Sequence, residues 1–585
     1  MLVKSFAAVI LKSRSVNLLR KPTAAMSTVP LSLDILSKFR NDFYSDPKNE
    51  LAQNVCTRFD PFEVAISRKK TETTLHVYNI KIQDVSQVRS NVRRSARRKR
   101  SRSARRRRSR SARRKRSRSA RRTKRVKETE AKAIDSEAKP VTNQENSGRC
   151  WLFAALNVMR LPFMKKYGIE EFEFSQSYLF FWDKIERAHY WLNNIVATAR
   201  QGEQLEGRLV NFLLKDPIND GGQWDMIVNL VNKYGVIPKK CFAESFSSRR
   251  SLHMNALIKT KLREYAKELR DKVAANASDE DIQCTIQQQM AVIYNIVATC
   301  LGNTLFCLFF NVICTELRDK VAANASDEDI QCTIQQQMAV IYNIVATCLG
   351  TPPEKFNYEY YNKEKAYNSF GMLTPQEFYE KHVRPLFDVN NKVCLVSDPR
   401  QSNPFGQLYT LHCLGNVVGG RQTAYNNQPI ETLMTAVKDS IAGGEAVWFG
   451  CEVSKRFERK NGFEDLDAQD YRLVFNTEVQ IGMNKADRLM YGDSWMTHAM
   501  VFTAVGTDEK GNPLKFRVEN SYSDKEYDKG YLLLTAPWFR EFVFEVVVDK
   551  KYVPDEVLQV FKQEPKVLPA WDPMGTLACP FCSKE

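Results

Sequence analysis

The stretch Thr142–Asn157, TNQENSGRCWLFAALN, places a cysteine between a polar, turn-forming run and an apolar segment. From Cys150 onward apolar residues recur at helical spacing, so we predict a helix that starts at Cys150 and stops at Pro162. The partial positive charge at a helix N-terminus lowers the pKa of a thiol, and the thiolate is the reactive form. Cys150 is therefore a candidate nucleophile, and a nucleophile of this kind needs an imidazole as its proton partner.

The chain has six histidines, and His498 has the most distinctive surroundings. It stands near the start of a buried-strand pattern, where a histidine that merely packs in the core is the ordinary alternative. Asn520 ends the next strand pattern, and its side chain can fix the imidazole tautomer that faces the thiol. Gln144 can donate to an oxyanion together with the backbone N–H of Cys150. The four residues together are the constellation of a thiol hydrolase.

The order of these residues along the chain resembles that of the papain-like cysteine peptidases. More narrowly, it resembles their bleomycin-hydrolase branch of cytosolic aminopeptidases. The resemblance runs over nearly the whole chain, and its longest motifs are KPVTNQENSGRCWLFAALNVMRLPFMKK from Lys139, NDGGQWDM from Asn219, VGGRQTAYNNQPI from Val418, MTHAMVFTAV from Met496 and LPAWDPMGTLA from Leu568.

The resemblance implies an α+β papain-like fold in which a helical half packs against a β-rich half, with the cleft between them. Helical insertions are expected to build a homohexameric ring with the active sites facing an internal cavity. Cys150 would attack the scissile carbonyl, His498 would carry the proton, Asn520 would orient the imidazole and Gln144 would help to stabilise the oxyanion. No cofactor or metal is implied.

The C-terminal tail is implied to enter the cleft near Leu577 and Ala578, where its carboxylate would hold the free amino group of the substrate. This chain continues beyond Ala578 as CPFCSKE, which would displace the carboxylate unless the extension is trimmed. The single Cys-x-x-Cys of that extension lacks the second pair that a structural zinc site needs. A second departure is Tyr522, where the family has a tryptophan that shields the Asn–His hydrogen bond.

The net charge of +19 arises from one segment, because Arg89 to Lys127 holds 23 Lys and Arg residues and no acidic residue. Its Ser-Ala-Arg-Arg repeats have a period of eight and no apolar side chains to pack, so we expect a disordered insertion. Non-specific nucleic-acid binding through phosphate neutralisation is one interpretation, and a low-complexity expansion without a role is the other.

The first 30 residues are basic and contain no acidic residue. They are consistent with a mitochondrial transit peptide or with a disordered extension in which Met26 starts a shorter form. No apolar run is long enough to span a membrane, and the cysteines are scattered, which favours reduced thiols inside the cell. We therefore expect a cytoplasmic protein, with a mitochondrial form as the alternative.

A 35-residue block occurs twice without change, at 268–302 and at 316–350, and each copy has the pattern of a helical pair. One copy, about 303–350, is expected to be surplus to the fold. The predicted division is therefore an N-terminal extension at 1–30, the start of the peptidase at 31–88, the basic insertion at 89–127, the peptidase core at 128–567 and the tail at 568–585.

The sequence thus predicts a cysteine aminopeptidase that acts on short or unfolded peptides and on amide analogues. The alternative is a nucleic-acid-binding protein that uses Arg89 to Lys127 on an inert peptidase scaffold.

Overall fold

The computed structural model describes residues 130–134, 138–275, 281–283, 285–290, 292–293 and 352–576, together with 30, 32, 36 and 37. Several predictions fall outside these residues. They concern the transit peptide, the basic insertion from Arg89 to Lys127, the second copy of the duplicated block, and the tail residues Leu577 and Ala578 with the extension beyond them.

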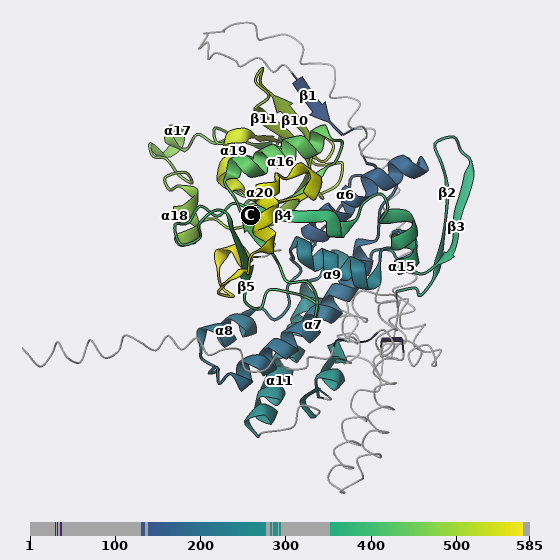
Figure 1. Ribbon diagram of the computed structural model, residues 1–585, viewed down its shortest axis with the longest axis vertical. Coiled ribbons are helices and arrows are strands. Elements are labelled where there is room, and N and C mark those ends of the chain that lie inside the picture. Colours follow the sequence, from purple (N-terminus) through teal and green to yellow (C-terminus); the bar gives the residue numbers. More distant parts are fainter. Residues whose placement is uncertain are drawn as a thin grey trace, which may run out of the picture.

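The first half of the described chain is helical, and its helices gather on one side of the molecule (Figure 1). The central helix is α6, which is buried around nearly its whole circumference and touches α7, α9, β7 and β10. The helices of this half are α6 (Cys150–Tyr167), α7 (Gln176–Arg200), α8 (Arg208–Lys215), α9 (Trp224–Tyr234), α10 (Phe246–Arg249) and α11 (Leu252–Ala274).

The predicted stop of α6 at Pro162 is wrong, because the helix continues through this proline to Tyr167. A proline inside a helix removes one backbone hydrogen bond and strains the preceding turn. Burial beyond the proline outweighs that cost: the ring of Phe163 packs against those of Phe172 and Phe174 with centroids 4.7 and 5.5 Å apart. The helix ends at Gly168, whose left-handed φ of 61° lets its N–H bond to Met164.

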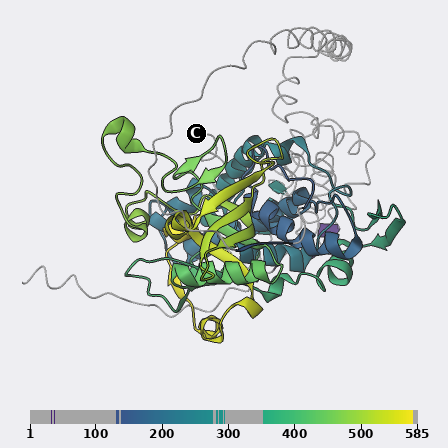
Figure 2. The same ribbon diagram turned by 90° about the horizontal axis from the view of Figure 1, so that it is seen from above.

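The second half of the described chain is built around a twelve-stranded sheet in the order β14-β5-β6-β4-β13-β7-β10-β11-β12-β9-β8, with β1 paired to β10. In both Figure 1 and Figure 2 the green and yellow strands lie beside the blue and teal helices. The strands of this sheet are β1 (Glu130–Ala133), β4 (Lys392–Val396), β5 (Gln407–Leu411), β6 (Tyr425–Asn427), β7 (Val447–Cys451), β8 (Phe457–Glu458), β9 (Phe463–Glu464), β10 (His498–Thr507), β11 (Pro513–Glu519), β12 (Tyr531–Thr535), β13 (Val543–Asp549) and β14 (Lys566–Leu568).

A separate hairpin and several short helices complete the described fold. The hairpin pairs β2 (Phe356–Tyr361) with β3 (Tyr367–Leu373). The remaining α-helices are α15 (Pro375–Phe378), α16 (Ile430–Ala442), α17 (Tyr471–Phe475), α18 (Lys485–Met490), α19 (Ala536–Phe542) and α20 (Asp555–Gln559), and single 3-10 or π turns are η1 (Tyr379–Val383), η2 (Val389–Asn391), η3 (Lys550–Tyr552), η4 (Val560–Lys562) and η5 (Pro573–Gly575).

Strand β7 joins the two halves because its side chains alternate between them. Val447 and Phe449 point into the core between the sheet and the helices α16 and α19, whereas Trp448 points into the core around α6. The indole N–H of Trp448 donates to the carbonyl of Trp151, one residue after Cys150, at 3.2 Å. The first turn of α6 is therefore fastened directly to the sheet.

Part of the first copy of the duplicated block belongs to this core. The described residues 281–283 and 285–290 are helical, and the apolar side chains of Ile282, Ile286, Met290 and Ile293 are buried in the core around α6. The described residues of this copy are thus integrated by burial at helical spacing.

Candidate active site

Cys150 is the first residue of α6, and its side chain is fully buried. Three backbone N–H groups face the thiol sulfur: those of Cys150 and Trp151 at the helix start and that of Ala499 in β10. Ala499 directly follows His498, so the thiol lies beside the strand that carries the candidate imidazole. The N-terminal end of a helix and converging N–H groups are what a thiolate requires.

Burial dominates the ionisation of this thiol. It raises the pKa of Cys150 to about 12, although the three N–H groups act to lower it. The carboxylate of Asp220 raises the pKa further because a second negative charge lies nearby. A thiolate therefore forms here most easily when its proton passes to a neighbour, so that the site as a whole gains no net charge.

The candidate proton acceptor is His498, the first residue of β10, which directly precedes Ala499. Its side chain is buried. Its Nε2 lies 2.9 Å from Oδ1 of Asn520, which follows directly on the paired strand β11. An amide oxygen can only accept, so this contact assigns the hydrogen to Nε2 and leaves the Nδ1 lone pair for a proton from the thiol. Burial lowers the pKa of His498 to about 4, and the bond to Asn520 opposes that shift.

Tyr522 lies over the imidazole on this side of the site. The two rings are nearly parallel, with their centroids 5.8 Å apart and an interplanar angle of 22°. The tyrosine thus covers the imidazole at the position where the sequence departs from the family that it resembles. The same segment is held by Ser521, whose backbone N–H donates to Oδ1 of Asn520 at 2.8 Å.

Gln144 connects the two sides of the site. Its Nε2 donates to the carbonyl of Ser147 at 2.8 Å, and its Oε1 accepts from the hydroxyl of Ser521 at 2.8 Å. Its backbone N–H also donates to the carbonyl of Ser521. The segment that follows β11 is therefore tied to the loop before Cys150. The amide nitrogen carries two hydrogens, and its contact with Ser147 uses one of them.

Residues that the sequence did not assign complete the cysteine side. The indole of Trp151 donates to the carbonyl of Asp220 at 2.6 Å, and a Cβ at Gly222 would lie 2.6 Å from the ring of Trp151. Gly222 is thus required by the close approach of the ring rather than by a turn. The motif NDGGQWDM was recognised in the sequence. No pattern indicated, however, that its first aspartate, Asp220, contacts the segment before Cys150.

Comparison with known proteins identifies the family of the chain. The chain matches the Peptidase C1-like family over residues 84–312 and 308–575. It is 44% identical to bleomycin hydrolase of Gallus gallus and 42% identical to that of Homo sapiens, in each case over 94% of this chain and 100% of the relative. It is also 37% identical to aminopeptidase C of Listeria monocytogenes over 75% of this chain and 86% of the relative.

Among solved structures, the crystal structure of PepW from Lactobacillus rhamnosis HN001 matches with a TM-score of 0.65 and 39% identity. The match covers 76% of this chain and 88% of PepW. The chain belongs to the Peptidase C1-like family. The predicted α+β papain-like fold and the predicted resemblance to bleomycin hydrolase are confirmed. Its similarity to these relatives also shows that the chain is a cysteine aminopeptidase.

The tail of this Peptidase C1-like chain is described as far as Thr576. Strand β14 pairs with β5, and Arg400 makes a two-pronged contact with Asp572 through Nη1 and Nη2 at 3.1 and 2.7 Å. Beyond that anchor, Nε2 of Gln223 donates to the carbonyl of Thr576 at 3.2 Å. The last described residue of the tail therefore contacts the residue next to Gly222, on the cysteine side of the site.

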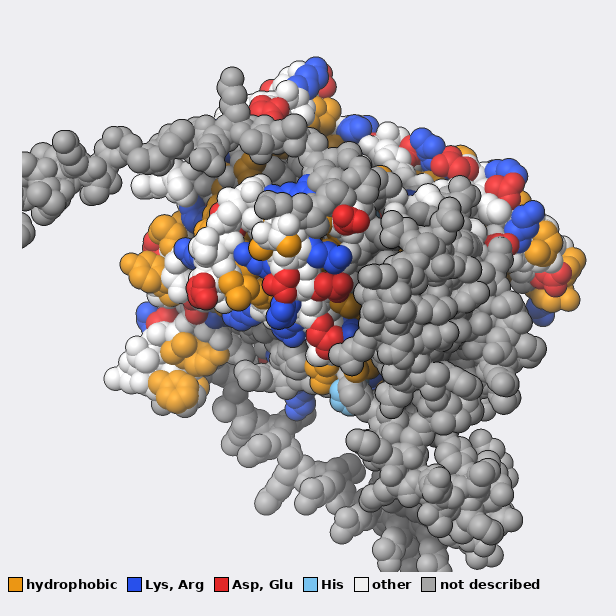
Figure 3. All heavy atoms as spheres, turned by 90° about the horizontal axis from the view of Figure 1, so that it is seen from below, with side chains coloured by type: hydrophobic (Ala, Val, Ile, Leu, Met, Phe, Trp, Pro, Cys, Tyr) orange, Lys and Arg blue, Asp and Glu red, His pale blue; other side chains and the backbone are white. Residues whose placement is uncertain are grey.

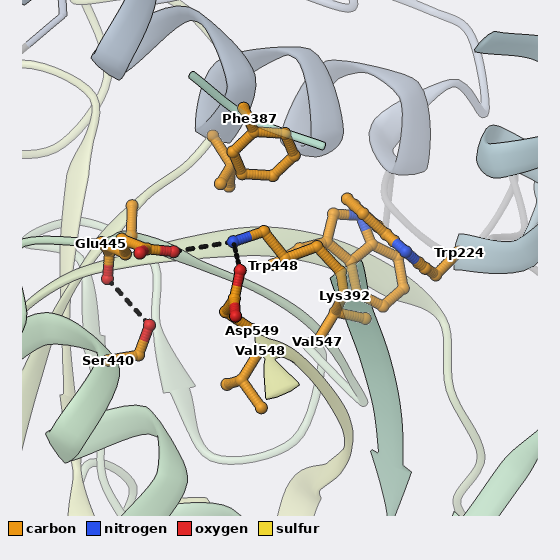
Figure 4. A pocket seen from close by; sticks show the side chains of 11 residues that line it. Trp224, Phe387, Lys392, Ser440, Glu445, Trp448, Val547, Val548 and Asp549 are labelled. Atoms are coloured by element: carbon orange, nitrogen blue, oxygen red, sulfur yellow. Dashed lines mark hydrogen bonds and ion pairs between the residues drawn. The ribbon is translucent and has the colours of Figure 1, made fainter. Parts of the chain in front are cut away.

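A separate pocket lies further along α6, where Val158, Trp224, Phe387 and Trp448 are among its lining residues (Figure 4). Its charged groups satisfy one another, because the ammonium of Lys392 lies 2.7 Å from Glu445 and 2.9 Å from Asp549. Neither Cys150 nor His498 lines this pocket. We therefore interpret this pocket as a structural feature with paired charges, and not as the substrate site.

Two absences apply to the part of the chain that the structure describes. None of its helices is both long and apolar enough to cross a bilayer. Within the same residues, no group of three or more His, Cys, Asp or Glu side chains is arranged to hold a metal ion.

Proposed function

We propose that this chain removes N-terminal residues from short or unfolded peptides, and hydrolyses amide analogues, with Cys150 as the nucleophile. The observation that carries the proposal is the arrangement of the thiol at the start of α6, beside Ala499 and the bonded pair of His498 and Asn520. The names of its relatives, bleomycin hydrolase and aminopeptidase C, support the same reaction class.

In the first step, the thiol proton passes to Nδ1 of His498 while the sulfur attacks the carbonyl carbon of the scissile amide. The developing oxyanion accepts from the backbone N–H of Cys150 and from the remaining amide hydrogen of Gln144. The imidazolium then gives its proton to the leaving amine, the C–N bond breaks, and a thioester remains on Cys150. Water, deprotonated by His498, hydrolyses the thioester and restores the thiol.

The restriction to N-terminal residues is proposed to come from the tail. The contact between Gln223 and Thr576 brings the chain toward the cysteine side of the site, and Leu577 and Ala578 follow immediately. A terminal carboxylate at that point would pair with the free amino group of a substrate. Removal of the seven residues after Ala578 is therefore expected to strengthen aminopeptidase action.

The test uses the chain that ends at Ala578, and compares its action on a dye-linked amino acid that has a free amino group with its action on the N-blocked counterpart. We expect cleavage of the free-amino substrate alone, loss of cleavage in Cys150→Ala, and normal cleavage in Cys241→Ala, which removes a cysteine elsewhere in the chain. Cleavage of both substrates would contradict the tail clamp and leave the nucleophile intact. Cleavage that survives Cys150→Ala would contradict the assignment of the nucleophile.

Three further properties remain predictions from the sequence: a homohexameric ring, a cytoplasmic or mitochondrial location, and nucleic-acid binding through Arg89 to Lys127. The nucleic-acid alternative gains no support from the relatives. On the face shown in Figure 3, Lys and Arg side chains of the described residues are interspersed with Asp and Glu. That part of the surface offers no continuous basic patch for phosphates.

A further inference from the structure

Asp220 is a fully buried carboxylate that the reaction sequence above does not use. It lies in the segment between α8 and α9, and four donors from three parts of the chain converge on it. Gly148 donates its N–H to Oδ2 at 3.2 Å, the amide of Asn255 donates to Oδ1 at 2.7 Å, and Ser251 donates its hydroxyl to Oδ2. The fourth donor is Lys184, whose ammonium lies 2.8 Å from Oδ1.

This residue holds the nucleophile segment on both sides of Cys150. Gly148, two residues before the cysteine, donates to the carboxylate of Asp220, and Trp151, one residue after it, donates to the carbonyl of Asp220. A segment fastened at two points so close together has little freedom to shift its thiol. Bonds to an ionised oxygen are also stronger than bonds between neutral groups.

The charge of Asp220 is retained because Lys184 compensates it inside the protein. Both side chains are fully buried. Burial acts to raise the pKa of Asp220, but the ion pair with Lys184 and the donated hydrogen bonds outweigh it and hold this pKa well below its usual range. For Lys184, burial lowers the pKa, and the charges of Asp220 and Asp183 oppose that shift. Removal of either partner alone would leave an uncompensated buried charge.

The pair also produces an electric field at the thiol. Among the described residues, two titratable side chains interact electrostatically with Cys150: Asp220 on the cysteine side and the buried Cys451 on β7. His498 directly precedes Ala499 on β10. Arg187, next to Lys184 on α7, is paired with Asp183 at 2.9 Å and so contributes little net charge. The negative end of the ion pair is the end that faces the nucleophile segment, and it opposes a thiolate there.

We propose that Asp220 and Lys184 are a positioning pair that holds the Cys150 segment in place and, through the balance of their two charges, sets the pH at which the thiol ionises. The proposal rests on the proposed function, because it takes Cys150 as the nucleophile. Its distinctive consequence is that removing the two charges has opposite effects on the reactivity of the same sulfur.

The test follows alkylation of Cys150 by iodoacetamide as a function of pH, with the modified peptide identified by mass spectrometry. Asp220→Asn keeps an acceptor oxygen and removes the negative charge, so alkylation below the apparent pKa should become roughly three- to tenfold faster. Lys184→Gln leaves the carboxylate uncompensated, so alkylation should become slower and its pH profile should move to higher pH. The double variant should lie between the two.

Ser251→Ala is the matched control, because it removes one hydrogen bond to Asp220 without changing a charge, and its pH profile should stay where it is. Equal changes in Asp220→Asn and Lys184→Gln would overturn the proposal, since simple loosening of the segment moves both in one direction. If Lys184→Gln fails to fold, the comparison of Asp220→Asn with the double variant decides: identical profiles overturn the proposal. Alkylation does not require peptidase turnover, so the failure of the proposed function would leave this result separately readable.

Discussion

The two sides of the site are held by different kinds of groups. On the cysteine side, ion pairs predominate: Asp220 with Lys184, and Arg149 with Glu244 at 3.0 Å. On the histidine side, the groups beside the imidazole are neutral: the amide of Asn520, the backbone N–H of Ser521 and the ring of Tyr522. Asp220 and Lys184 are buried, and so are His498, Asn520 and Ser521. The difference therefore does not follow from exposure to solvent.

The difference matches what each side has to do. The segment around Cys150 must stay in place through the whole cycle, and hydrogen bonds to charged groups hold it firmly. In the proposed reaction the imidazole takes up and releases a proton in every turnover. A carboxylate beside it would favour the charged form, whereas the oxygen of Asn520 orients the ring and leaves both forms accessible.

The largest effect is expected at the residue that joins the two sides. Gln144→Ala removes a donor to the oxyanion and the tie to Ser521, so kcat should fall by about 100- to 1000-fold. Steady-state kinetics with the free-amino substrate measures it. Ser521→Ala is the control, because it removes the tie and keeps the amide, and its kcat should fall far less. Equal losses in both would mean that Gln144 acts only as a structural link.

A smaller effect is expected when the neutral side is given a charge. Asn520→Asp keeps an acceptor oxygen for the imidazole and adds a negative charge beside it. The pKa of His498, which burial holds at about 4, should rise by about 1 to 3 because the imidazolium is stabilised. An NMR titration of the ring of His498 measures this. Asn520→Ala is the control without the charge, and a rise of similar size there would contradict the explanation.

The smallest effect is expected at Ser523, next to the ring that covers the imidazole. Its φ of 71° is in the left-handed region, which is costly for a residue with a side chain. Ser523→Gly should stabilise the protein by about 0.5 to 1 kcal/mol, measured as a rise in the midpoint of thermal unfolding. Ser523→Ala is the control, because it also removes the hydroxyl but keeps the Cβ in the left-handed region, so it should not gain stability.

The identities of the candidate catalytic residues could be predicted because each one carries a local signal. Cys150 ends a polar run at a helix start, His498 opens a strand pattern, and Asn520 closes the next one. These signals depend on residue spacing, which the sequence states directly. The prediction failed where local preference and packing disagree: Pro162 reads as a stop, but the aromatic cluster around Phe163 keeps the helix going.

The sequence by itself therefore determined the family, the α+β fold and the order of the four candidate residues. Only the tertiary structure placed Ala499 beside the thiol and Asp220 between Gly148 and Lys184. These contacts join residues that lie far apart in the chain, so no periodicity reports them. Whether a carboxylate such as that of Asp220 is charged depends on its burial and on the cation that meets it there, and both exist only after the chain has folded.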